Sequence, residues 1–222
     1  MAQIFQRSAN TIAKASIVAL VLLGGITALA VTQFARSSYL TGQFVDRPQP
    51  VQFSHKHHTG DDGIDCRYCH TSVETSNSAG LPSTQTCMNC HQQIWSDSPY
   101  LEIVRASYRE NKPIQWERVH DLPDYVYFNH SIHVAKGVGC STCHGQIDDM
   151  PAVHQVSTLQ MEWCLSCHRE PEKFLRPKSE IYNMNYPAEN NTTELLTTGQ
   201  QLKIDYKVRS AGMMTSCSTC HR

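Results

Sequence analysis

The sequence predicts a mainly α-helical chain with much irregular structure, preceded by one helix long enough to cross a membrane. Three observations predict this class. Residues 15–34 are uncharged and mostly apolar, and a pattern Cys-x-x-Cys-His occurs five times afterwards, using all 10 cysteines. No stretch alternates apolar and polar residues for long enough to indicate a strand. We therefore expect an N-terminal tail and anchor at 1–36, a linker at 37–52 and a cysteine-rich domain at 53–222.

The apolar stretch is long enough to be a membrane anchor. At about 1.5 Å per residue, a helix over 15–34 would cross a hydrocarbon core of roughly 30 Å. Arg7 and Lys14 precede it without an acidic residue, which places the N-terminus in the cytoplasm. A cleavable signal peptide is the alternative, because Ala28-Leu29-Ala30 fits the cleavage rule. The run exceeds the usual signal core, so we favour a retained single-pass anchor.

The linker and two later stretches show helix signals and helix breakers. Gly42, Pro48 and Pro50 discourage a continuous helix in the linker. Ser98-Pro99 indicates a helix start, and Asn111-Lys112-Pro113 indicates its end. The expected apolar face of this helix consists of Leu101, Val104 and Tyr108.

A second helix is expected over 161–175, ending before Pro177. Residues 169–216 contain no cysteine motif and include three prolines, so part of this segment is expected to run extended.

The cysteine motifs indicate covalent haem. Two thiols three positions apart can form thioethers to the two vinyl groups of one haem, and the adjacent histidine then reaches the iron as proximal ligand. Zinc sites also use Cys-x-x-Cys pairs but do not require histidine in the fifth place, and cysteines this close rarely form a disulfide. We therefore predict five haem c groups. The cysteines are Cys66, Cys69, Cys87, Cys90, Cys140, Cys143, Cys164, Cys167, Cys217 and Cys220, and the proximal histidines are His70, His91, His144, His168 and His221.

This chemistry also predicts a compartment. Haem is attached to reduced thiols on the outer side of the bacterial inner membrane, so we expect the domain in the periplasm and the anchor in that membrane. The formal net charge is −1, and no basic run suggests a nucleic-acid partner.

The motifs belong to an internal repeat. Phe53-x-His-x-x-His precedes the first two motifs, and Phe128-x-His-x-x-His precedes the next two, each part following its counterpart by 74 to 77 residues. The fifth motif resembles the first half of a third unit. We predict haem-pair units at about 53–127 and 128–200, with a half unit at 201–222.

Histidines in the Phe-x-His-x-x-His elements are the expected sixth ligands. Positions i and i+3 are neighbours on a helical turn, and the two side chains can diverge to reach two irons. The expected distal ligands are His55, His58, His130 and His133. His57 lies on another side of its turn and is expected to be solvated.

Four distal histidines leave one iron without a second ligand. His120 is a candidate because a proline-bounded turn follows it, and methionine is an established axial ligand that raises the haem potential. The sequence leaves the choice open among His120, Met150, Met161 and Met184, with His154, Met213, Met214 or an open site as further alternatives.

Several strings resemble one family. They are Phe53-Ser-His-Lys-His-His, Gly63-Ile-Asp-Cys-Arg-Tyr-Cys-His, Val119-His-Asp-Leu-Pro-Asp-Tyr-Val-Tyr-Phe-Asn-His-Ser-Ile-His and Leu159-Gln-Met-Glu-Trp-Cys-Leu-Ser-Cys-His. From about Gln52 onwards the chain is similar to the pentahaem cytochrome c subunit of bacterial alternative complex III, a quinol:cytochrome c or oxidase oxidoreductase. The resemblance implies the multihaem haem-pair fold. The implied partners are an iron–sulfur, molybdopterin-like large subunit, a monohaem cytochrome c and integral membrane quinol-binding subunits, with a cytochrome c or terminal oxidase as acceptor.

The expected function is therefore respiratory electron transport by a subunit that is not a catalyst on its own. A stand-alone membrane-anchored quinol dehydrogenase that feeds a periplasmic reductase is the main alternative. A multihaem nitrite or sulfite reductase would need an iron with an open distal position. The 12 histidines cover the five proximal and four distal places, which argues against this third reading.

Overall fold

A computed structural model describes residues 4–221. Its contacts divide the chain into two compact units, with the boundary between Gln43 and Phe44. The two units are described separately below.

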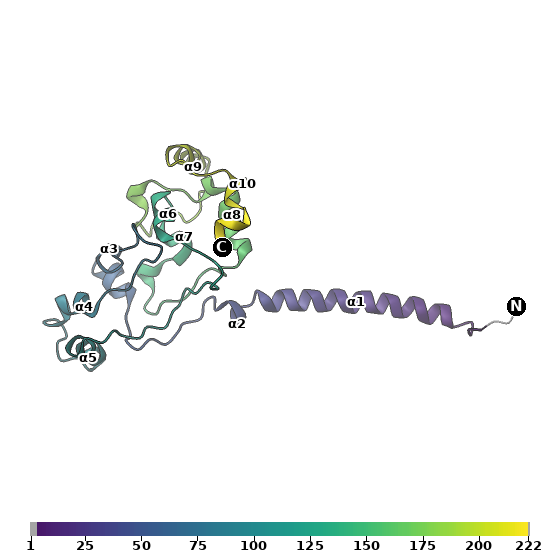
Figure 1. The fold of residues 1–222 in the computed structure, drawn as a ribbon, viewed down its shortest axis with the longest axis horizontal. Helices are drawn as coiled ribbons and strands as arrows, with labels where there is room; N and C mark the ends of the chain where they lie inside the picture. Colours follow the sequence, from purple (N-terminus) through teal and green to yellow (C-terminus); the bar gives the residue numbers. More distant parts are fainter. Residues whose placement is uncertain (1–3, 222) are drawn as a thin grey trace. The chain divides into compact units, whose positions relative to one another are not determined.

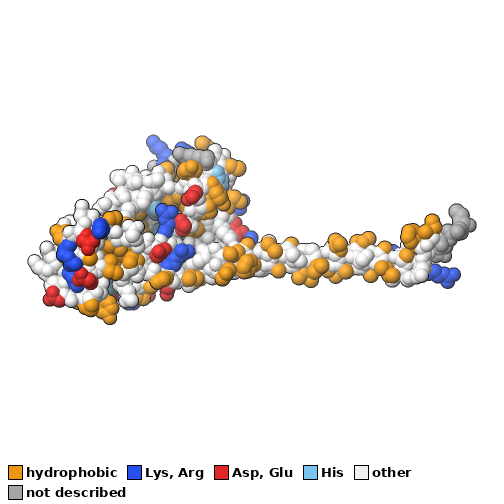
Figure 2. All heavy atoms as spheres, turned by 60° about the horizontal axis from the view of Figure 1, so that its bottom comes forward, with side chains coloured by type: hydrophobic (Ala, Val, Ile, Leu, Met, Phe, Trp, Pro, Cys, Tyr) orange, Lys and Arg blue, Asp and Glu red, His pale blue; other side chains and the backbone are white. Residues whose placement is uncertain are grey.

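The first unit consists of a long apolar helix followed by a short one. Helix α1 (Ala9–Ala35) is 27 residues long and has no buried residue. This helix is long and apolar enough to cross a membrane. A signal sequence near the N-terminus would have the same length and composition. Hydrophobic side chains line the face of α1 visible in Figure 2. Helix α2 (Ser38–Thr41) is a single turn that ends at Gly42, whose φ of 70° is easily adopted by glycine. The predicted linker thus begins with one helical turn.

The second unit consists of short helices joined by irregular chain, as Figure 1 shows. Residues 44–221 contain no β-strand, and an isolated bridge joins Val138 to Leu175. The predicted fold class is confirmed. The α-helices are α3 (Cys66–Cys69), α4 (Thr84–His91), α5 (Glu102–Glu110), α6 (His130–Ala135), α7 (Cys140–His144), α8 (Met161–Arg169), α9 (Thr193–Asp205), α10 (Ala211–Met214) and α11 (Cys217–Cys220). The single turns are a π-helix η1 (Lys56–Asp61) and the 3-10 helices η2 (Pro99–Leu101), η3 (Ile147–Asp149), η4 (Pro171–Lys173) and η5 (Lys178–Glu180).

Every cysteine motif either starts a helix or lies within one. Helices α3, α7 and α11 start at the first cysteine of their motif, whereas α4 and α8 start three residues before theirs. In Figure 1, α4 and α5 lie at one end of this unit, α8, α9 and α10 lie at the other end, and α6 and α7 lie between them.

The conventional core of this unit is small and supports the second motif. Val51, Met88, Leu101 and Val104 form a buried apolar cluster, which joins α4 to α5. The helix predicted from Ser98 is present as η2 followed by α5, and Asn111 ends it in the left-handed region with φ 51°. Of the residues expected on one face of this helix, Leu101 and Val104 are buried, whereas Tyr108 is 47% exposed.

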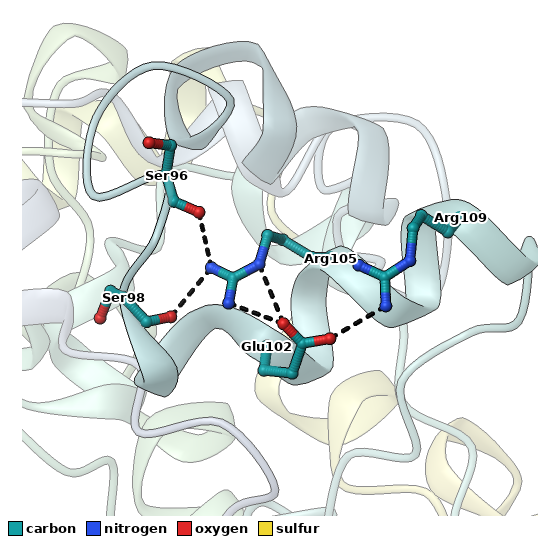
Figure 3. Close-up of polar contacts among 5 residues, drawn as sticks. All are labelled: Ser96, Ser98, Glu102, Arg105 and Arg109. Carbon is teal, nitrogen blue, oxygen red and sulfur yellow. Dashed lines mark hydrogen bonds and ion pairs between the residues drawn. The ribbon is translucent and has the colours of Figure 1, made fainter.

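Arg105 connects α5 to the loop that follows the second motif. Its guanidinium donates to the carbonyl oxygens of Ser96 and Ser98, at 2.8 and 2.9 Å, and to the carboxylate of Glu102 (Figure 3). Arg109 contacts the other oxygen of that carboxylate at 2.9 Å. These bonds hold the loop 92–98 against the start of α5.

Replacing Arg105 by alanine should destabilise this end of the protein. Two carbonyl groups would lose a charged donor, and each hydrogen bond of this kind contributes about 1.5–3 kcal/mol to the free energy of unfolding. Urea unfolding followed by circular dichroism measures the loss. R109A is the matched control, because Arg109 is exposed and contacts Glu102 without bonding the loop. Equal destabilisation by both variants would contradict this role of Arg105.

One sequence prediction about the C-terminal half was wrong, and one helix there was not predicted. The helix expected to continue to residue 175 ends at Arg169, because Pro171 lacks an N–H and restricts Glu170, whose φ and ψ are −132° and 61°. The segment 169–216, of which part was expected to run extended, also contains α9, the longest α-helix described in the second unit. Thr192 caps it by accepting from the Leu195 N–H, a start signal that was present in the sequence.

Candidate haem-ligand sites

Four pairs of imidazole rings face one another across similar gaps. In each pair, one ring belongs to a cysteine motif and the other to a Phe-x-His-x-x-His element. The ring centres are separated by 6.4 Å for His55 and His70, 6.1 Å for His58 and His91, 6.4 Å for His130 and His144, and 6.2 Å for His133 and His168. The interplanar angles are 5°, 67°, 8° and 24° in the same order.

This spacing fits one metal between each pair of rings. A metal–imidazole bond is about 2 Å long, so two such bonds plus half a ring on each side separate the ring centres by roughly 6 Å. Direct stacking of two rings would bring the centres closer than the observed 6.1–6.4 Å. The four pairs therefore fit an iron held by two histidines.

Hydrogen bonds orient most of these rings. The Nδ1 atoms of the proximal His70, His91, His168 and His221 contact the carbonyl oxygens of Gly80, Ile94, Met214 and Tyr125, at 2.8–3.1 Å. Those of the distal His58, His130 and His133 contact the carbonyl oxygens of Ser54, Asn77 and Asn129, at 2.7–2.9 Å. A carbonyl accepts, so Nδ1 carries the proton and Nε2 keeps its lone pair for a metal.

The two Phe-x-His-x-x-His elements repeat the same local geometry. Phe53 stacks on His58 with ring centres 4.5 Å apart and an angle of 23°, and Phe128 stacks on His133 with the same values. The second element is an α-helix capped by Asn129, whereas the first forms the π-helix η1. His57 is exposed, as predicted, near the carboxylates of Asp61 and Asp62.

His120 lies against the third motif. Its Nε2 is 3.2 Å from Nδ1 of His144, and the two rings are 4.3 Å apart at 75°. Burial lowers the pKa of His120 to about 4, which keeps it neutral and able to accept. His144 is thus the one proximal histidine whose recorded Nδ1 partner is another imidazole rather than a carbonyl. This contact could not be predicted from residue spacing, because the two histidines are 24 positions apart in the chain.

The methionine candidates differ in their surroundings. Met150 and Met184 are packed inside the protein, at 7% and 5% exposure. Met161 is 69% exposed at the start of α8, which packs against α10. His154 contacts the Asp46 carboxylate at 3.0 Å.

Electrostatic coupling between cysteines shows which motifs are neighbours. Burial, together with the nearby thiols of Cys140 and Cys164, raises the pKa of Cys143 to about 12. Thiols of different motifs interact electrostatically in four pairs: Cys69 and Cys87, Cys66 and Cys140, Cys143 and Cys164, and Cys164 and Cys220. The motifs are therefore arranged in the order second, first, third, fourth and fifth. This order agrees with the positions of α4, α3, α7 and α8 in Figure 1.

Two family matches cover most of the chain. Residues 33–116 match the class III cytochrome c family, and residues 126–222 match the family described as cytochrome c7 and related cytochrome c. The chain is a multihaem cytochrome c of the class III and c7 type. Covalent c-type haem and a role in electron transfer follow from this membership.

A curated relative of this cytochrome is the menaquinone reductase, multiheme cytochrome c subunit of Nitratidesulfovibrio vulgaris strain Hildenborough. The two are 36% identical over 102 residues, which cover 46% of this chain and 48% of the relative. The cytochrome therefore spans about half the length of that relative in the match.

Proposed function

We propose that this cytochrome relays electrons through five covalently bound haems within a membrane-bound, quinone-linked respiratory complex. The observation that carries the proposal is the set of four facing imidazole pairs along one row of motifs. Each haem, when bound, takes up and releases one electron. Two histidines hold the iron in both redox states, which keeps reorganisation small and leaves no coordination position for a substrate.

The proposed ligand pairs are those of the facing rings. His70 and His55 would hold the first haem, His91 and His58 the second, His144 and His130 the third, and His168 and His133 the fourth. His221 would hold the fifth together with Met161. Among His120, Met150, Met161 and Met184, Met161 is preferred because its side chain is exposed, whereas protein encloses Met150 and Met184, and His120 already contacts His144.

The proposed location and partners follow from the resemblance and from α1. Helix α1 would anchor the cytochrome in the bacterial inner membrane, with the N-terminus in the cytoplasm and the haem domain in the periplasm. An iron–sulfur large subunit and quinol-binding membrane subunits would deliver electrons, and a monohaem cytochrome c or a terminal oxidase would accept them. The name of the relative favours a second candidate in which electrons flow toward menaquinone.

Haem counting combined with carbon monoxide binding tests the relay. We expect five haems per chain from the pyridine haemochrome spectrum and no change in the reduced spectrum on adding carbon monoxide. The weak far-red absorption of a methionine-ligated ferric haem should also be present. A shift of about one haem in five would reveal an open iron and would favour a reductase.

The direction of flow needs the intact complex. Menaquinol added to the purified complex should reduce the haems if quinol is the donor. If menaquinol leaves them oxidised and added menaquinone reoxidises reduced haems, the second candidate is correct.

A further inference from the structure

Arg176 is a buried charge beside the third haem motif. Its side chain is 1% exposed, and the guanidinium donates to the hydroxyl oxygens of Ser141 and Thr142, at 3.2 and 3.0 Å. These two residues separate Cys140 from Cys143. The charge therefore lies directly behind α7, the helix to which the third haem would be attached.

The partners of Arg176 solvate its charge without neutralising it. Besides the two hydroxyls, it donates to the carbonyl oxygens of Glu180, Asn183 and Pro187, at 3.2–3.4 Å. All five acceptors are neutral. The Glu180 carboxylate is close enough to interact electrostatically with the guanidinium, but it accepts from the Asn183 side-chain amide at 2.7 Å and has no hydrogen bond with Arg176. Dipoles stabilise a cation locally but leave its net charge, and a guanidinium does not lose its proton in proteins.

The remaining guanidinium nitrogen is enclosed by backbone. Nε of Arg176 is buried and has no hydrogen-bond partner, and a Cβ on Gly139 would collide with the guanidinium. Tyr186 covers the group from another side, with its ring centre 4.9 Å away. Solvent and ions therefore have little access to the charge, so salt screens it weakly.

The fifth motif provides an internal comparison, because Cys217-Ser-Thr-Cys-His repeats the sequence Cys140-Ser-Thr-Cys-His. There the Thr219 hydroxyl donates to the Met213 carbonyl at 2.8 Å, and Ser218 is exposed and pairs with Ser216. The same five residues thus lie on a buried cation in one place and on neutral partners in the other. The motif itself does not require the arginine.

We propose that Arg176 sets the reduction potential of the haem at Cys140 and Cys143, holding it above the potentials of the other bis-histidine haems. Reduction adds one negative charge to the iron site, so a fixed positive charge nearby favours the reduced form, most strongly in a poorly screened interior. Because the third motif lies in the middle of the row, electrons would rest there between transfers. The inference depends on the proposed function for its ligand pairs.

Potentiometric titration of the full-length, haem-loaded protein tests the inference. R176Q should lower the midpoint potential of one haem component of five, whereas R176K should retain most of the wild-type value. R209Q, which removes an exposed charge, is the control and should leave the titration unchanged. An unshifted titration for R176Q, or equal shifts for R176Q and R176K, would overturn the inference.

If R176Q attaches fewer haems than the wild-type protein, a second measurement tests the same inference. H120N should alter the electron paramagnetic resonance signal of the third haem alone, because His120 contacts His144. The signal marked in this way must titrate above those of the other bis-histidine haems in wild-type protein, and a lower potential would overturn the inference. Fewer than five haems in wild-type protein would instead contradict the proposed function.

Discussion

Replacing His58 by alanine should open one iron to carbon monoxide. His58 faces His91 with ring centres 6.1 Å apart, and its Nδ1 is occupied by the Ser54 carbonyl. Removing the imidazole would leave the second haem with one ligand. We expect the reduced spectrum of H58A to shift with carbon monoxide by about one haem in five, and the potential of that haem to rise.

H57A is the matched control for this experiment, because the two histidines are adjacent in one helical turn. His57 is exposed and lies 3.6–3.8 Å from the carboxylates of Asp61 and Asp62. Its removal should leave carbon monoxide binding absent. Equal binding by both variants would contradict the assignment of His58 as a ligand.

Replacing Gly199 by alanine should destabilise the protein strongly. Gly199 is buried in α9 at the closest approach to η4, and a Cβ there would collide with the Glu172 carbonyl oxygen. The collision involves backbone, which cannot rotate away, so helix α9 would have to move. Overpacking of this kind costs typically about 1–3 kcal/mol and occasionally more. Chemical denaturation followed at the haem and in the far ultraviolet measures the loss.

G212A is the matched control in another helix. A Cβ on Gly212 in α10 meets nothing within 4 Å. Alanine there should be neutral or stabilise by up to about 1 kcal/mol, because glycine loses more backbone entropy in a helix. A G199A protein as stable as G212A would show that α9 does not pack on η4 as described.

Helix α9 matters to the haem region because of where it docks. Lys203 pairs with Glu172 at 2.7 Å, and Asn190 donates to the carbonyl oxygens of Glu172 and Leu175. Leu175 precedes Arg176, whose side chain lies behind the third motif. Displacing α9 would therefore loosen the segment that positions that charge.

Much of the local structure could be predicted because its causes are local. Asn111 and Pro113 end α5 through their own backbone preferences, and the spacing of His130 and His133 places both on one helical turn. Helix α8 ends at Arg169, well before Pro177, because Pro171 already interrupts it. Helix α9 is harder to predict, because its residues are of mixed polarity and Gly199 is the one buried residue recorded in it, although Thr192 caps its start.

The sequence by itself determined that haem is attached covalently, because thioether formation and proximal ligation depend on residues within one helical turn. It also predicted the distal ligands, because the histidines of the two Phe-x-His-x-x-His elements lie outside the cysteine motifs. Only the tertiary structure decided which rings face each other, that His120 contacts His144, and that Arg176 is buried behind Ser141 and Thr142. These contacts join segments far apart in the chain, so their geometry depends on how the irregular connections pack. The spacing of residues along the sequence does not predict that packing.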